Sequence, residues 1–190
     1  MVMNFFKIPT QFSKKMLLVL LTGIMCSTSM AQTLFGSMNG VISIVGDING
    51  TAVTASSKEL QITLDYEYAS FEMRLPPSTL YTGIDFLDNE FKEMTENDII
   101  LNGQLGIGHI NTNQHPTQHF NFKGVLKQLD KIVEIKGTGH LEHVDGVGKF
   151  ACLLGLTFEV DPEGLELGLL GYSKLNIQMR QTVLNPLDSE

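Results

Sequence analysis

The chain has 190 residues, a formal net charge of −8 and only two cysteines, and 43% of its residues are hydrophobic. This length suits one domain, with or without a short leader, and is enough to bury a substantial core. The excess of acidic side chains repels phosphate backbones and anionic lipid surfaces, so it argues against a nucleic-acid-binding protein.

The N-terminus predicts a secretory signal peptide over residues 1–31. Lys14 and Lys15 precede a short apolar run, and small or polar residues lead up to Ala31. A basic start, a short apolar run and small residues before a cut site are typical of such leaders, so we expect cleavage after Ala31. The alternative, an uncleaved membrane anchor, is disfavoured because a spanning helix needs about 20 apolar residues.

Residues 32–190 are expected to form a single domain. Residues 1–31 hold three lysines and no acidic residue, so the net charge of the remaining 159 residues is −11. Cys152 is the only cysteine after Ala31, which excludes an intrachain disulfide. An exported domain without a disulfide must be stabilised by its core. We expect it in a periplasm or outside the cell.

The first half of the domain alternates apolar and polar residues, which predicts strands. These strands are expected over residues 34–45, 51–56, 58–65 and 69–75. Apolar side chains occupy even positions up to Leu64 and odd positions from Ala69. This change of parity indicates a turn or bulge at residues 65–68.

One helix is predicted after the Pro76-Pro77 pair. Its apolar residues recur at a spacing of three to four, at Ile84, Leu87, Phe91 and Met94. Thr82 and Asp85 resemble a capping box at its start. Asp88, Glu90 and Glu93 are expected to face solvent rather than bind a cation, because the spacing of a calcium loop is absent.

The second half of the domain again predicts strands, over residues 98–110, 120–129, 131–143, 150–160, 165–170 and 173–184. The total is eight to ten strands, each with one apolar face, and one short helix. Strands do not alternate with helices, so a parallel sheet is disfavoured. The pattern is typical of an all-β antiparallel sandwich or barrel.

The histidines allow a metal-dependent enzyme as one hypothesis, with His109, His115 and His143 as its residues. His109 and His143 have inward parity and could meet inside the fold. His115 lies in the turn at Pro116, and no zinc-hydrolase motif accompanies the three. Histidines that are hydrogen-bonded at the rim or in the core are therefore favoured over a metal site.

No other feature of the sequence names a catalytic mechanism. Cys152 lies on the apolar face of its strand, where burial raises the pKa of a thiol and makes it inert. The sequence contains neither a nucleophile elbow nor a glycine-rich phosphate loop at a helix start. We therefore expect a protein that is not an enzyme and that uses no cofactor.

The inward positions are rich in Phe and Met, which can form an adaptable lining for a hydrophobic ligand. The predicted ligand-binding residues are Phe71, Met73, Leu105, Ile107, His109, Phe120, Phe122, Phe150, Leu154, Phe158, Ile177 and Met179. Glycines at inward or bending positions are expected to leave unfilled volume, at Gly103, Gly106, Gly108, Gly137 and Gly139. The alternative is an ordinary packed core, because small barrels either fill their interior or hold one ligand.

Several motifs, in this order, resemble the YceI-like family of exported polyisoprenoid-binding proteins. They are the strand end Leu75 to Gly83 (LPPSTLYTG), a short helix, the strand start His115 to Phe120 (HPTQHF) and the segment Gly137 to Leu141 (GTGHL). The resemblance covers about residues 37 to 183. It implies a lipocalin-like antiparallel β-barrel with a long hydrophobic cavity for an isoprenoid chain. The family's helix signature and the threonine of its third strand are missing, which affects the identity of the ligand more than the barrel.

The expected protein is thus an exported antiparallel lipocalin-like β-barrel that holds a lipid or isoprenoid-like molecule. Its partner would be a hydrophobic small molecule or lipid, and not nucleic acid. The first alternative is a structural or surface-interaction barrel with a filled core, which predicts an exposed apolar patch or a stable oligomer such as a homodimer. The metal-dependent enzyme is the second alternative.

Overall fold

The computed structural model describes residues 34–48, 50–108, 110, 116–144, 151–161 and 174–187. Contacts between residues divide the chain into the units Met1–Ala31 and Gln32–Glu190, and all described residues belong to the second unit. The predicted signal peptide and the predicted strand at residues 165–170 lie outside the described residues.

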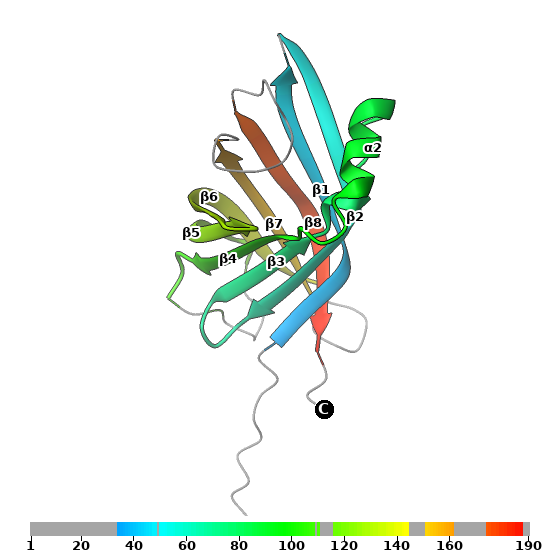
Figure 1. Cartoon of the computed structure of the whole chain (residues 1–190). Coiled ribbons are helices and arrows are strands. Elements are labelled where there is room, and N and C mark those ends of the chain that lie inside the picture. The colour runs from blue at the N-terminus through cyan, green and yellow to red at the C-terminus, as the bar shows by residue number, and fades with distance from the viewer. Residues whose placement is uncertain are drawn as a thin grey trace, which may run out of the picture. The chain divides into compact units, whose positions relative to one another are not determined.

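The described residues form a closed barrel of antiparallel strands (Figure 1). The strands are β1 (Leu34–Ile48), β2 (Thr51–Asp65), β3 (Ser70–Leu75), β4 (Ile99–Leu105), β5 (Gln118–Gln128), β6 (Lys131–Val144), β7 (Ala151–Val160) and β8 (Leu175–Pro186). Each strand pairs with the next in sequence, and β8 closes the ring on β1. Closure pairs the edge strands that an open sheet would expose. The all-β prediction is confirmed, and the fold is a barrel rather than a sandwich.

Strand β2 is one continuous strand where the alternation predicts two. Its register with β1 shifts on both sides of Gly40, between Ser37 and Ile42. The buried residues of β2 change parity across this shift, from Ala55 and Ser57 to Leu60, Ile62 and Leu64. A bulge in a paired strand moves side chains to the other face without ending the strand, which the sequence pattern could not distinguish from a turn.

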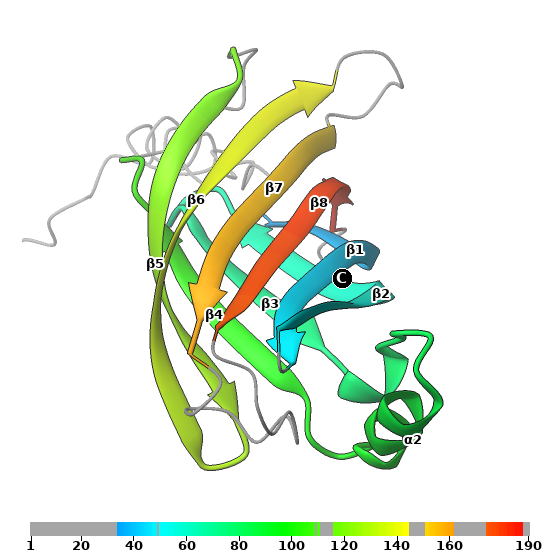
Figure 2. The ribbon, with the colours of Figure 1, turned by 90° about the horizontal axis from the view of Figure 1, so that it is seen from above.

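The two ends of the barrel differ in what they carry (Figure 2). We call the end that holds residues 75–99 and the hairpin turn at residues 128–131 the helix end. The other end holds residues 65–70, the N-terminal end of β1 and the C-terminal end of β8. We call it the terminal end. Figure 2 shows the strands surrounding one interior, called the lumen below, with the helix at one end.

The predicted helix is present as α2 (Asp85–Glu93), after a short 3₁₀ helix, η1 (Pro77–Thr79). Its buried apolar residues are Leu87 and Phe91, and Ile84 and Met94 pack against the core, as the spacing predicts. The preceding segment is tied to β2 by the hydroxyls of Ser57 and Thr79, which lie 2.7 Å apart. None of the helices in the described ranges is long and apolar enough to cross a membrane.

The start of α2 differs from the predicted capping box. Asp85 makes no capping hydrogen bond. Instead the carboxylate of Asp88 accepts hydrogen bonds from the backbone N–H groups of Thr82 and Gly83, at 2.7 and 3.1 Å, and from the Thr82 hydroxyl. Burial by itself would raise the pKa of Asp88, but these hydrogen bonds hold it below its usual value. Asp88 is therefore buried and not solvated as expected. Its carboxylate fixes the loop before the helix.

The turn between β5 and β6 contains a strained residue. Gln128 pairs with Lys131, and Leu129 in the two-residue turn has φ of 51°. A branched L-residue in this left-handed region costs about 1–2 kcal/mol, whereas asparagine tolerates it.

We expect Leu129→Asn to raise the free energy of unfolding by about 1 kcal/mol, because the side chain is exposed and only the strain is relieved. Urea unfolding of the variant measures this change. Leu129→Ala is the control and is expected to gain nothing, since alanine keeps the strain. Equal stability of the asparagine and alanine variants would contradict the account.

Candidate functional site in the barrel lumen

The inward faces of the strands place most of the predicted ligand-binding residues inside the lumen. At most 6% of each of these side chains is exposed: Phe71, Met73, Leu105, Phe120, Phe122, Leu154, Phe158, Ile177 and Met179. Ile107 follows the end of β4 and is only partly buried against the core. His109 and Phe150 lie outside the described residues. Contact of these residues with a ligand stays a prediction.

Three phenyl rings pack together across the lumen. The ring of Phe122 on β5 is 5.4 Å from that of Phe71 on β3 and 5.8 Å from that of Phe158 on β7, measured between centroids. Both pairs are edge-to-face, the arrangement that the charge distribution of aromatic rings favours. Because the rings come from alternate strands, they fill the lumen between opposite walls.

Phenyl rings in the lumen pack directly against inward glycines on the neighbouring strands. Gly103 pairs with Phe71, Gly137 pairs with Phe122, and Gly139 pairs with Phe120. A Cβ added at any of the three glycines would overlap the ring opposite it. The expectation that these glycines leave empty volume is therefore wrong, because aromatic rings from the neighbouring strand occupy it.

A cavity enclosed by described residues of the lumen is small. A cavity of about 30 Å³ is lined by Ile42, Ile44, Leu60, Met73, Leu75, Ile99, Leu101, Leu126, Phe158 and Ile177. This volume accepts about one water molecule and is far too small for a lipid chain. The three phenyl rings occupy the middle of the lumen, where the family resemblance implies a long cavity.

A polar cluster lies inside the lumen at the terminal end. Tyr66 stacks on Phe35 with ring centroids 4.2 Å apart, and its hydroxyl lies 3.5 Å from Nε2 of His143. Cys152 is the cross-strand partner of His143. Burial raises the pKa of the Cys152 thiol to about 11, and burial also raises the pKa of the Tyr66 hydroxyl. Neither group is therefore a nucleophile near neutral pH.

We expect the native thiol of Cys152 to resist a thiol reagent at pH 8. The folded state keeps the thiol neutral, so its contribution to stability is complete below pH 9. It is lost as the pH rises toward 11, by about 2–3 kcal/mol in total. Urea unfolding between pH 8 and 11 measures this loss, and the Cys152→Val variant should lose less over the same range. Rapid labelling of the native thiol would contradict the burial.

Gln128 is a buried polar residue at the helix end and is not among the predicted ligand-binding residues. It is 1% exposed, and neither its amide nitrogen nor its amide oxygen has a hydrogen-bond partner. It lies on β5 with the inward parity of Phe122 and Leu126. Parity places Gln128 on the inward face after Leu126, but parity does not show that its amide is enclosed.

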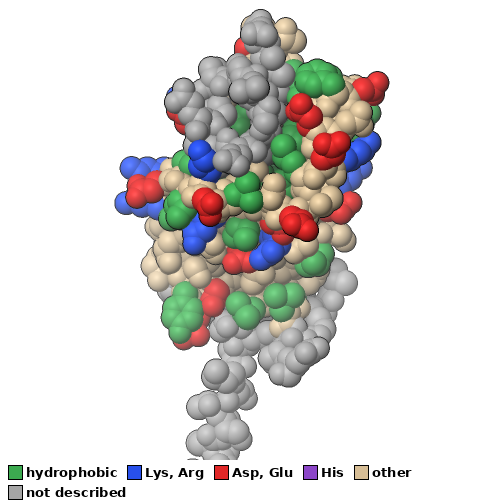
Figure 3. All heavy atoms as spheres, in the orientation of Figure 1, with side chains coloured by type: hydrophobic (Ala, Val, Ile, Leu, Met, Phe, Trp, Pro, Cys, Tyr) green, Lys and Arg blue, Asp and Glu red, His purple; other side chains and the backbone are tan. Residues whose placement is uncertain are grey.

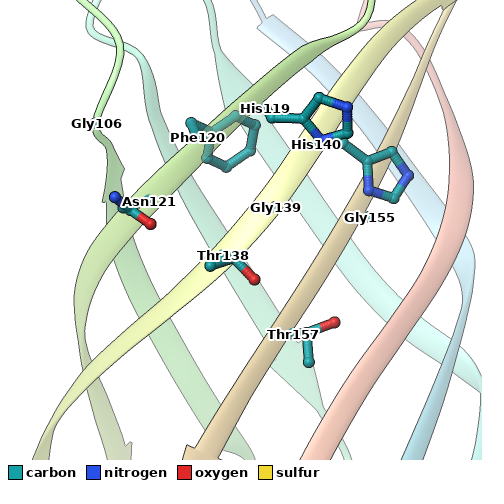
Figure 4. Close-up of a pocket in the computed structure, with 9 residues that line it drawn as sticks. All are labelled: Gly106, His119, Phe120, Asn121, Thr138, Gly139, His140, Gly155 and Thr157. Carbon is teal, nitrogen blue, oxygen red and sulfur yellow. The ribbon is translucent and has the colours of Figure 1, made fainter.

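The outer face of β5–β7 carries a shallow polar depression of about 520 Å³ (Figure 4). His119 and His140 are paired across the strands there, with ring centroids 6.2 Å apart, and the ring of His140 packs on Gly155. Both histidines lie on the outer face, whereas His143 lies in the lumen and cannot join them.

The metal-enzyme hypothesis gains no converging ligands from the described residues. Within these ranges no group of three or more His, Cys, Asp or Glu side chains could hold a metal ion. His109 and His115 lie outside the described residues.

Charged side chains of both signs are mixed over the face shown in Figure 3. Ion pairs include Arg74 with Asp98, at 3.0 Å, and Lys174 with Glu159, at 3.5 Å. Lysines and arginines do not gather into a patch on the described part of this face.

No protein-family model matches the chain, and no curated protein matches it. Two solved structures are similar to it. A polyisoprenoid-binding domain from Saccharophagus degradans, implicated in plant cell wall breakdown, has a TM-score of 0.61 and 7% sequence identity over 80% of this chain and 97% of its own. Burkholderia cenocepacia BcnA has a TM-score of 0.54 and 10% identity over 76% of this chain and 94% of its own. The resemblance to the YceI-like barrel is thereby confirmed for the fold.

Proposed function

We propose that the protein is an exported binding protein that holds one hydrophobic molecule, such as a lipid or an isoprenoid, in its lumen. The observation that carries this proposal is the apolar inner surface shared by all strands, whose central filling consists of phenyl rings resting on glycines. A ring that lies on a glycine meets no side chain from that position and can rotate away from the wall. The likeness to a polyisoprenoid-binding domain supports the same function.

A bound chain must bury enough apolar surface to offset both the burial and the contacts of the phenyl rings that it displaces. Burying a dozen methylene groups contributes about 10 kcal/mol, at about 0.8 kcal/mol for each group. The two edge-to-face contacts of Phe122 contribute about 0.5–1.5 kcal/mol each beyond the area that they bury. Only molecules with an open lumen can bind, so the observed affinity is the intrinsic affinity multiplied by the fraction that is open. The burial energy of a long chain can offset this reduction.

A structural barrel without a ligand is the second candidate. The specific observation in its favour is that the cavity found within the lumen has a volume of only about 30 Å³, which is typical of a filled core. The two candidates differ in one respect that can be measured directly, the presence of a bound molecule.

Native mass spectrometry of protein purified without detergent distinguishes the two candidates. The proposal predicts a complex with one hydrophobic molecule, which organic extraction removes and which returns when the extract is added back. Protein that is free of ligand before extraction, and that binds nothing from a lipid extract of its own cells, would favour the filled barrel.

Export is part of the proposal. It is supported by the basic and apolar residues before Ala31 and by the small or polar residues that lead up to it. N-terminal sequencing of the protein from its native cells should start at Gln32. A mature protein that retains Met1 would contradict export by a cleaved leader.

A further inference from the structure

We propose that the side-chain amide of Gln128 receives an uncharged, hydrogen-bonding head group of the ligand, such as a hydroxyl, carbonyl or amide. This inference rests on the proposed function and adds the chemical class of the ligand and its orientation. The head group would lie at the helix end of the lumen, and the chain would extend from there past Leu126 toward Phe122.

The first observation is the isolation of the Gln128 amide. The residue is 1% exposed, and its nitrogen and oxygen both lack hydrogen-bond partners. Buried polar atoms are hydrogen-bonded in most proteins, because an unpaired donor or acceptor in an apolar interior loses the hydrogen bonds that it makes to water. An amide that is unpaired at both atoms therefore indicates a missing partner.

The second observation is the position of Gln128 beside the cavity. Leu126, two residues earlier on the same inward face of β5, lines the cavity of about 30 Å³. Leu101 pairs with Leu126 across the strands, and Ile99 and Leu75 line the same cavity farther toward the helix end. Gln128 does not line this cavity itself but lies one inward position beyond Leu126, toward the helix end.

The third observation concerns charge. The buried polar or charged residues within the described ranges are Ser57, Asp88, Gln128 and Thr182. None is a lysine or arginine, and the carboxylate of Asp88 is already bonded to Thr82 and Gly83. A phosphate or diphosphate head group would be desolvated in this lumen without a compensating cation, so a neutral head is favoured.

The chemistry of the amide defines the class of head group. A glutamine side chain offers two N–H donors and a carbonyl acceptor. An alcohol, a phenol or a primary amide can satisfy both atoms at once, and a ketone or quinone carbonyl can accept from the nitrogen. These head groups also occur on isoprenoids and fatty chains, which fits the apolar remainder of the lumen.

Three probes with one sixteen-carbon chain test the inference: hexadecanol, hexadecane and hexadecyl phosphate, each delivered from cyclodextrin. Competition against a fluorescent lipid gives their relative affinities. We expect the native protein to prefer hexadecanol over hexadecane by about 10-fold, since one satisfied hydrogen bond in a buried site has about this effect. Hexadecyl phosphate should bind more weakly than hexadecanol.

Gln128→Leu and Gln128→Met remove the amide and put an apolar side chain of similar size in its place. Both variants are expected to bind hexadecane as well as the native protein does and to lose the preference for hexadecanol. Gln178→Leu, at an exposed position on β8, is the matched control and should keep the preference. The methionine variant maintains the test if the leucine variant does not fold.

An unchanged preference in both Gln128 variants would overturn the inference and indicate that the amide binds only a structural water. Tighter binding of hexadecyl phosphate than of hexadecanol to the native protein would overturn the neutral head group. Failure of every probe to bind the native protein would count against the proposed function itself, which separates the two failures.

Discussion

Replacing Phe122 by alanine is expected to lower the free energy of unfolding by about 3–5 kcal/mol, the range found for Phe to Ala in protein cores. Phe122 is 2% exposed and makes edge-to-face contacts with Phe71 and Phe158 on opposite sides of the lumen. Its removal leaves a cavity between three strands. Urea unfolding, followed by circular dichroism, measures the change. Phe86→Ala on α2 is the control, because the side chain is 61% exposed and should change stability by less than about 0.5 kcal/mol.

The same Phe122→Ala variant separates a binding barrel from a filled one. A lumen that accepts a chain should bind hexadecanol more tightly once Phe122 no longer has to move, and the ligand should restore part of the lost stability. A filled barrel predicts lost stability that hexadecanol does not restore. A loss of stability no greater than that of Phe86→Ala would contradict the place of Phe122 at the centre of the core.

Replacing Gly137 by alanine is expected to be the other severe change, with a loss of about 1–3 kcal/mol or more. A Cβ at this position would overlap the backbone oxygen of Thr157 on β7 and lie 2.6 Å from the ring of Phe122. The oxygen belongs to the neighbouring strand and cannot rotate away, so β6 and β7 would have to separate. Thermal and urea unfolding measure the effect.

Gly108→Ala is the matched control for Gly137→Ala. A Cβ at Gly108 has no atom within 4 Å, so the substitution should be neutral or slightly stabilising through a lower entropy of the unfolded chain. If the two variants had equal stability, the close approach of Thr157 and Phe122 to Gly137 would be contradicted.

The strands and their inward faces could be predicted from the sequence because alternation depends only on neighbouring residues. Val160, Leu175, Ile177 and Met179 are buried where parity places them. The helix face through Leu87 and Phe91 follows from spacing in the same way. The fold class is therefore largely contained in local patterns.

The filling of the lumen depends on register, which local patterns do not contain. Phe71 covers Gly103 only because the two residues are paired across β3 and β4. Until that pairing is known, an inward glycine looks like empty space. The same limit applies to Asp88, whose partners Thr82 and Gly83 are reached through the fold of a loop rather than through a helix motif.

Gln128 illustrates a different limit. Its parity was readable, but a single polar residue at the end of a strand is more often solvated than buried. Only the closed barrel shows that the amide is enclosed and without a partner. The proposed class of head group could therefore not be predicted from the sequence. The apolar lining that would hold the chain could be.

Isothermal titration calorimetry with an isoprenoid alcohol, repeated at several temperatures, tests the central claim most directly. Binding in the lumen predicts one molecule for each protein and a negative heat-capacity change, because apolar surface leaves water on binding. The absence of binding by delipidated, refolded protein, or the uptake of several molecules with little change in heat capacity, would contradict a ligand-binding lumen.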